Sequence, residues 1–346
     1  MKPQILRDNG IVPTAPAAMA APVGAPSPEA ARHPVRMDRL PRVDGSDPDH
    51  VVRALVAGLR LADFTEAADG SSTHAALADV LHCEPEEMIL FPSRADAVDA
   101  LVATLVPPAS AVICQEPYDG RPDLAAAARG AQVRHWTPRA GTFHYDPMDL
   151  SRQLSTAAGA LVVLHDPHPV LGTNLGDIPL VAVVTAATIT TSTLVVDETL
   201  DCYRGYSSHA LLRGRGGVVR IGSLSEPLGL RGAPLAYAIG EPRLLDAIRA
   251  HHRGGAVAAA TVAVVGETYP RWIGHLAAGR RRLFPGWVAH VSEIRRCLPS
   301  SRVLGGRPLF VTLDLASRDR AGRLARFLAS RGIVVKTFSS YPSFSS

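Results

Sequence analysis

Short apolar runs alternate with alanine-rich helical segments over most of this chain, and this alternation is the feature that most limits its fold. Strands separated by helices of about ten residues need crossover connections, which predict a mainly parallel sheet covered by helices on both faces. Ligands of such sheets usually bind beyond the carboxyl ends of the strands. The expected strands are 88–91, 111–114, 132–136, 160–164, 193–197 and 218–223, and the expected helices between them are 95–105, 123–129 and 179–190.

The chain is predicted to have three parts. Residues 1–36 are rich in alanine and proline and show no apolar period, so they are expected to form a flexible arm. Residues 37–245 are expected to form a large domain, and residues 246–346 a connecting helix followed by a small domain with a strand, a helix and a strand. A chain of 346 residues that is 47% apolar is long enough for two such cores.

Charge and composition exclude several classes of protein. The net charge is +4, but the basic residues are scattered among acids, which argues against a nucleic-acid surface. The most apolar stretch, 180–196, contains five threonines and is shorter than the roughly 20 residues that span a bilayer. Four widely spaced cysteines without zinc-type spacing, and an N-terminus without a secretory pattern, indicate reduced thiols, no metal site and a cytoplasmic location.

Four segments of the chain carry a resemblance to a known family. They read CEPEEMIL at 83–90, LVVLHDPHP at 161–169, LVVDE at 194–198 and GSLSEPLGLRG at 222–232. In this order they resemble fold-type I pyridoxal-phosphate enzymes of aminotransferase class I/II, closest to the histidinol-phosphate aminotransferase branch. The resemblance covers roughly residues 50–338. It implies an α/β aminotransferase-like three-layer fold, a small α+β C-terminal domain that is truncated relative to the family, and a homodimer.

The resemblance also implies positions for the contacts of pyridoxal phosphate. Asp197 matches the aspartate beside the pyridine nitrogen, whose charge favours the protonated ring that acts as an electron sink. Ser223 and Ser225 match hydroxyl groups beside the phosphate, and the aromatic residue on the ring aligns near Tyr118 or Asp119. The structural alternatives are that Asp197 caps a turn and that the serines are ordinary loop residues. If a pyridoxal-like ligand binds, the candidates to hold it are Asp197, Ser223, Ser225, Arg231, Tyr118 and Arg94.

Glu226 stands where the resemblance places the lysine that forms the Schiff base. A carboxylate cannot form an imine with an aldehyde, so covalent pyridoxal chemistry of the usual kind is not expected. Other expected contacts are changed as well, which favours a natural protein that has left this chemistry over a single engineered substitution. The changed positions are Pro234 for the phosphate arginine, Pro169 for an asparagine, Leu200 for a tyrosine, and Pro92, which removes an N–H from the family's glycine-rich cup before the first large helix, 95–105.

Three functions fit these residues. The first, which we expect, is a cofactor-independent acid/base enzyme acting on a small molecule in specialised metabolism, with no bound cofactor, metal, nucleic acid or membrane. The second is a non-catalytic protein that binds a ligand or a partner subunit. The third is a residual transferase that holds pyridoxal phosphate non-covalently. The structural alternative for Glu226 is an ion pair with Arg231 or Arg94 that fills the emptied pocket. The candidate catalytic residues are Glu226, Asp197, His165 and His168.

Overall fold

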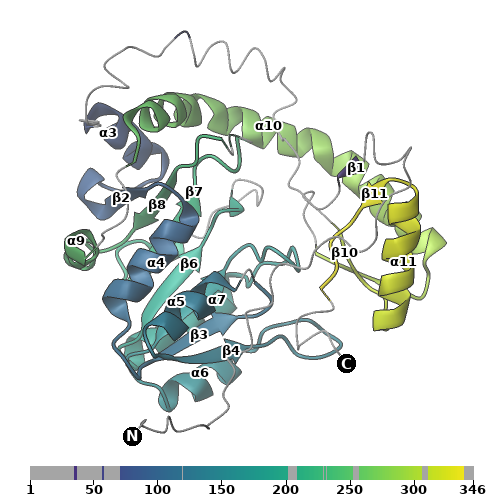
Figure 1. Ribbon diagram of the computed structural model, residues 1–346, viewed down its shortest axis with the longest axis horizontal. Coiled ribbons are helices and arrows are strands. Elements are labelled where there is room, and N and C mark those ends of the chain that lie inside the picture. The colour runs from purple at the N-terminus through teal and green to yellow at the C-terminus, as the bar shows by residue number, and fades with distance from the viewer. Residues whose placement is uncertain are drawn as a thin grey trace, which may run out of the picture.

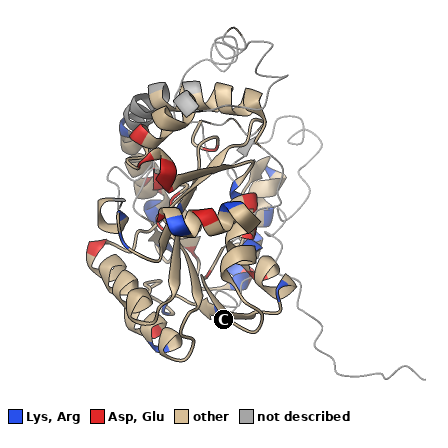
Figure 2. Cartoon of the chain, turned by 90° about the vertical axis from the view of Figure 1, so that its left-hand side faces the viewer, with Lys and Arg blue, Asp and Glu red and all other residues tan. Residues whose placement is uncertain are grey.

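The structure is a computed structural model, and it describes residues 35–36, 57, 71–118, 120–201, 209–228, 230, 232–251, 257–305 and 311–338. The helix expected near 51–59 and almost all of the predicted arm lie outside these residues. In the described part of the chain, no helix has the length and apolarity needed to cross a membrane. Basic and acidic residues lie interspersed over the helices that face the viewer in Figure 2.

A seven-stranded sheet forms the centre of the large domain, in the order β2-β8-β7-β6-β5-β3-β4 (Figure 1). The strands from β7 to β4 run parallel to one another, whereas β8 is antiparallel to both of its neighbours. The expected mainly parallel sheet is therefore confirmed. The strands are β2 (Met88–Phe91), β3 (Ala111–Gln115), β4 (Gln132–Trp136), β5 (Leu161–His165), β6 (Thr193–Asp197), β7 (Val218–Ser223) and β8 (Ala236–Ile239).

Helices cover both faces of this sheet and make it the middle of three layers. Leu161 and Val163 of β5 pack on one face with α4, α5 and α9, and Val162 and Leu164 pack on the other with α6, α7 and α8. Because both faces are buried, the strand is apolar at successive positions rather than at alternate ones. These helices are α4 (Arg94–Leu105), α5 (Arg121–Ala128), α6 (Pro147–Ser155), α7 (Asp177–Ile189), α8 (His209–Leu212) and α9 (Pro242–His251).

Two further helices lie against the β2 and β8 side of the sheet. Leu77 of α3 (Ser71–Val80) and Val265 of α10 (Ala259–Cys297) share a buried cluster with Tyr237 of β8. A single turn of 3₁₀ helix, η1 (Pro85–Glu87), leads from α3 into β2. The long α10 then runs from the large domain to the small lobe (Figure 1).

The small lobe contains two short strand pairs and one helix. Strand β9 (Arg302–Leu304) is antiparallel to β10 (Thr312–Asp314), and β1 (Val35–Arg36) is parallel to β11 (Ile333–Val334) beside α11 (Arg318–Ser330). The last two residues of the predicted arm thus belong to a strand. The lobe meets the large domain where the Thr312 hydroxyl donates a hydrogen bond to the carbonyl of Val170.

Some elements differ from the prediction. The strand expected at 160–164 is shifted by one residue, so His165 ends β5. Helix α6 was not predicted, although Asp146 caps it by accepting a hydrogen bond from the Met148 N–H and Pro147 opens it, which is a recognised start signal. Strands β8 and β9 were missed because runs of three or four residues give little periodicity.

Candidate functional site

The carboxyl ends of four parallel strands bring several predicted residues to one edge of the sheet. Gln115, His165, Asp197 and Ser223 are the last residues of β3, β5, β6 and β7. His165 and Asp197 lie opposite each other in the β5–β6 register, and the His165 N–H donates to Oε1 of Gln115 at 2.7 Å. This edge is where ligands of parallel sheets usually bind, so it is the candidate site.

Asp197 is a buried carboxylate whose charge is compensated by Arg94. Its side chain is 3% exposed, and Oδ2 lies 3.0 Å from Nε of Arg94 and 3.6 Å from Nε2 of His165. The other oxygen, Oδ1, accepts the Thr199 N–H at 3.0 Å. A buried charge needs a partner of this kind, because leaving it uncompensated would strongly disfavour folding. Arg94, considered from the sequence as a partner for Glu226, is therefore paired with Asp197.

Thr199 adds a polar group that the sequence did not single out. Its Oγ1 is buried and has no hydrogen-bond partner among the residues that the structure describes. Buried hydroxyl groups nearly always have a partner, so an orphaned one calls for an explanation. The Thr199 N–H donates to Asp197, so Thr199 belongs to the immediate surroundings of this acid.

Tyr118 and His165 form an aromatic wall beside Asp197. Their ring centroids are 6.2 Å apart and the rings are inclined by 30°. The Tyr118 hydroxyl lies 3.5 Å from Nε2 of His135, which is 3.2 Å from the Asp123 carboxylate. Burial raises the pKa of Tyr118, and the hydrogen bond to Asp123 raises the pKa of His135. The phenol thus stays protonated while its ring packs against His165.

His168 is fully enclosed by the turn that follows β5. Its Nδ1 accepts the N–H groups of Val170 at 3.2 Å and Leu171 at 3.1 Å, so the proton of the neutral ring is on Nε2. Nε2 lies 2.9 Å from the Tyr145 hydroxyl, which it donates to, and that hydroxyl in turn donates to a backbone carbonyl. Both ring nitrogens hold the turn in place, an arrangement that favours a structural role; the predicted acid/base role stays a prediction.

Acid is expected to unfold the protein partly through His168. Burial, reinforced by nearby His165, holds the pKa of His168 well below the ordinary value of 6.5. As the pH falls, His168 therefore takes up a proton in the unfolded chain before it does so in the folded protein. The contribution of His168 to stability is complete above about pH 6.5 and declines as the pH falls below that value. We expect the free energy of unfolding, measured with urea, to change less between pH 7.5 and pH 5 for His168→Asn than for the parent. His251→Asn, at an exposed position of α9, is the matched control, and parallel curves for His168→Asn and the parent would contradict this account.

The loop after β7 contains the two predicted serines and Glu226. The Ser225 hydroxyl donates to the Ala233 carbonyl at 2.6 Å and accepts the Leu235 N–H at 2.8 Å. Ser223 accepts the N–H of half-buried Glu226 at 3.0 Å. Both serines therefore close the loop upon itself in this structure. Arg231, the other residue predicted near a phosphate, and Asp119, the alternative to Tyr118, lie outside the described residues.

A buried ion pair next to Asp197 was not predicted. Arg220 donates from Nε and Nη2 to the two oxygens of Glu198, at 3.0 and 2.7 Å, and the Tyr237 hydroxyl donates to the same carboxylate at 2.8 Å. Burial alone would lower the pKa of Arg220, but the charge of Glu198 outweighs it and raises that pKa. Tyr237 lies over Gly222, where a Cβ atom would come within 2.5 Å of the tyrosine oxygen. Because Glu198 follows Asp197 directly, this cluster fixes the end of β6.

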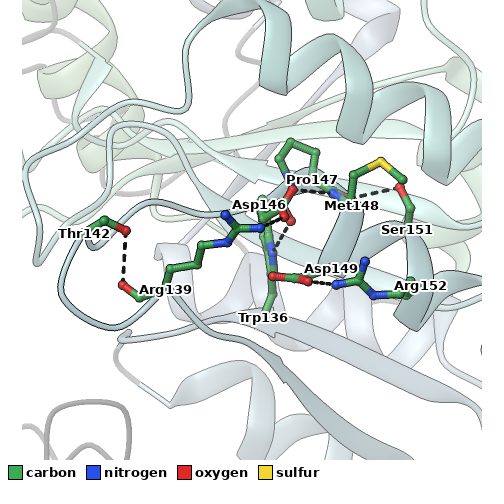
Figure 3. Close-up of polar contacts among 9 residues, drawn as sticks. All are labelled: Trp136, Arg139, Thr142, Asp146, Pro147, Met148, Asp149, Ser151 and Arg152. Atoms are coloured by element: carbon green, nitrogen blue, oxygen red, sulfur yellow. Dashed lines mark hydrogen bonds and ion pairs between the residues drawn. The ribbon is translucent and has the colours of Figure 1, made fainter.

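A hollow of about 400 Å³ lies elsewhere, between β4 and α6. Figure 3 shows the start of α6, where the Trp136 indole donates to the Asp146 carbonyl and Arg139 pairs with the Asp146 carboxylate. The side chains of Asp149 and Arg152 also pair with each other. None of the predicted site residues lines this hollow, so we do not take it as the functional site.

Lysine is nearly absent from the chain. Among its 346 residues only Lys2 and Lys336 are lysines, and Lys336 lies in the small lobe just after β11. Every other basic side chain apart from histidine is an arginine. An amine able to form an imine is therefore missing from the whole sheet domain and from both of its helical layers.

Comparisons with known proteins identify relatives of this architecture. The profile of the family described as aminotransferase class I and II matches residues 50–278. Histidinol-phosphate aminotransferase from Sinorhizobium meliloti in complex with pyridoxal-5′-phosphate is similar, with 18% identity over 89% of this chain and 83% of that one and a TM-score of 0.71. A single mutant of Thermus thermophilus aspartate aminotransferase gives 18% identity, coverage of 91% and 87% and a TM-score of 0.73. N-succinyldiaminopimelate aminotransferase from Mycobacterium tuberculosis gives 21% identity, coverage of 88% and 84% and a TM-score of 0.68.

These matches confirm the expected fold and correct the expectation about cofactors. The sequence led us to expect no cofactor, because Glu226 and its neighbours differ from the residues that the resemblance implied. That expectation is wrong, because the family match extends over most of the chain and the similar Sinorhizobium meliloti structure contains pyridoxal phosphate. No curated protein sequence matches the chain.

Proposed function

The chain belongs to the aminotransferase class I and II family, and from this membership we propose that it binds pyridoxal phosphate non-covalently at the carboxyl edge of its sheet. The observation that carries the proposal is the combination of a buried acid at the end of β6 with the lack of any lysine between residues 50 and 278. The buried carboxylate suits a pyridine ring, whereas the missing amine leaves no partner for an internal imine. We therefore propose no covalent bond between the cofactor and any residue from 50 to 278, the part of the chain that the family profile matches.

The donor groups at the edge fit a ligand held by polar and aromatic contacts. Asp197 offers a carboxylate, Thr199 two residues later has a buried hydroxyl without a partner among the described residues, and Tyr118 offers a buried ring that packs against His165. Arg94 adds a fixed positive charge at the start of α4. Ser223 and Ser225 would have to exchange bonds within their loop to reach a phosphate. When bound, pyridoxal phosphate supplies an electron sink for reactions at the carbon that bears a substrate amine.

The chain's own residues are proposed to orient the ligand and to handle protons. Asp197 cannot shift along the sheet, because β6 is bonded on both sides by β5 and β7. Glu226, in the loop after β7, is the proposed proton carrier, and its half-buried position supports a carboxyl group that can exchange protons with a small substrate. A small amine of specialised metabolism is the substrate class that we assign to this site.

A titration followed by chemical trapping tests the proposal. We expect pyridoxal phosphate to bind saturably, as followed by quenching of protein fluorescence, and to be removed completely by gel filtration. After treatment with borohydride, which traps imines, mass spectrometry of peptides is expected to show no adduct in the domain that carries the sheet. Because the chain has only two lysines, few side-chain amines can give an adduct in this assay. Lys336→Arg is the matched variant, and it is expected to bind pyridoxal phosphate as the parent does.

Two results would contradict the proposal in different ways. Absence of saturable binding would remove the cofactor from the function altogether. A stoichiometric adduct at Lys336 that disappears in Lys336→Arg would show that the small lobe supplies the amine, and binding would then be covalent after all.

A further inference from the structure

The ion pair between Arg94 and Asp197 has a consequence for the form of the ligand that the site accepts. We propose that Arg94 determines specificity, so that the site takes up pyridoxal phosphate with an uncharged ring nitrogen. This inference rests on the proposed function, since it concerns the same ligand at the same acid. It reverses the expectation drawn from the resemblance, in which the charge of Asp197 favours the protonated ring.

Both oxygens of the Asp197 carboxylate already accept hydrogen bonds or ion pairs. Oδ1 accepts the Thr199 N–H at 3.0 Å, while Oδ2 has Nε of Arg94 at 3.0 Å and Nε2 of His165 at 3.6 Å. A protonated pyridine would bring a second full positive charge to a carboxylate that is 3% exposed. An uncharged ring nitrogen brings no such charge.

Of the two cations that would then compete, the guanidinium is the one that keeps its proton. Arginine does not deprotonate in proteins, whereas a pyridine nitrogen beside a fixed positive charge loses its proton more easily. The compensated charge of Asp197 therefore no longer stabilises the pyridinium. The pyridine nitrogen, and not Arg94, is therefore the group that gives up its proton.

The start of α4, which carries Arg94, is fixed by a helix cap. Arg94 is the first residue of α4, and Ser93 caps that helix by accepting the Asp96 N–H at 3.2 Å and donating to the Asp96 carboxylate at 2.6 Å. A positive charge at a helix N-terminus is disfavoured by the helix dipole. The pairing with Asp197 offsets this cost, so leaving the carboxylate would be unfavourable for Arg94 as well.

The inference is tested with two ligands and three proteins. The ligands are pyridoxal phosphate and its N-methylated derivative, which carries a permanent positive charge on the ring. We expect the parent protein to bind the methylated ligand more weakly, and Arg94→Gln to narrow the ratio of the two dissociation constants by about tenfold or more. The control Arg121→Gln removes the first residue of α5, which pairs with Asp99 at a half-exposed site, and should leave the ratio unchanged.

A second measurement reads the protonation state of the ring nitrogen directly. In ¹⁵N NMR spectra of bound pyridoxal phosphate labelled at the ring nitrogen, the parent at pH 7.5 should give the resonance of a neutral pyridine. Arg94→Gln should move it toward the pyridinium position.

The outcomes separate this inference from the proposed function. Binding with a protonated ring in the parent, or equal ratios in the parent and Arg94→Gln, overturns the inference and leaves the proposed function standing. Failure of both the parent and Arg94→Gln to bind pyridoxal phosphate overturns the proposed function, and the inference with it. Binding by Arg94→Gln alone would overturn both, because the parent would then not take up the ligand in either form of its ring.

Discussion

Replacing Arg220 by methionine is expected to lower the free energy of unfolding by about 3–5 kcal/mol, the usual cost of removing one member of a buried ion pair. Arg220 is 6% exposed and Glu198 is 3% exposed, so water cannot take over the lost contact. The charge of Glu198 would be left with the Tyr237 hydroxyl as the one remaining donor of the described cluster. Urea denaturation at pH 7.5 measures the effect.

The double replacement Glu198→Met with Arg220→Met is the control for this prediction. It removes both charges, so no uncompensated ion stays in the core, and its cost is expected to be clearly smaller than that of the single variant. A single variant that loses under about 1 kcal/mol would show that the pair contributes no more than a surface ion pair does, contrary to its burial.

Gly222→Ala is expected to have the next largest effect, a loss of about 2–5 kcal/mol from overpacking and from a broken hydrogen bond to a charged group. The added Cβ would lie 2.5 Å from the oxygen and 2.6 Å from Cζ of Tyr237. The tyrosine would have to move away from Glu198, which lies just after the end of β6. Thermal and urea unfolding of the purified variant measure the loss.

Two further variants test the cause of that loss. In a Tyr237→Leu background, Gly222→Ala should cost much less, because the clashing ring is gone. Gly286→Ala, in the exposed part of α10 where a Cβ would meet no atom within 4 Å, should leave stability unchanged or raise it slightly. An equal loss for Gly222→Ala in both backgrounds would rule out the clash with Tyr237.

The fold could be predicted well from the sequence, because buried parallel strands are recognisable as continuous apolar runs. The bounds of β4, β6 and β7 agree with the expected ranges, and β5 is shifted by one residue. The short β8 and β9 could not be found in this way, since runs of four and three residues are too short to show a clear apolar pattern. Helix α6 could have been found from Asp146 and Pro147 at its start.

The candidate site was predictable in its positions but not in its pairing. The resemblance implied that Asp197, at the end of an expected strand, lies near a ligand, and His165 was a candidate on the facing turn; the structure places the two side by side. The pairing of Asp197 with Arg94 joins segments far apart in the sequence, and a pattern along one chain does not reveal which cation reaches a buried acid. The same holds for Glu198, which lies just after β6, and Arg220 on β7.

The pairing of β1 with β11 bears on the order in which the molecule can assemble during translation. All strands of the seven-stranded sheet lie between Met88 and Ile239, so a nascent chain has the complete sheet available well before its last residues are made. Val35 and Arg36, by contrast, must wait for Ile333 and Val334 to leave the ribosome before they gain a neighbouring strand. The small lobe is thus expected to close last, and a ribosome stalled near the end of α10 would carry a formed sheet with an unfinished lobe.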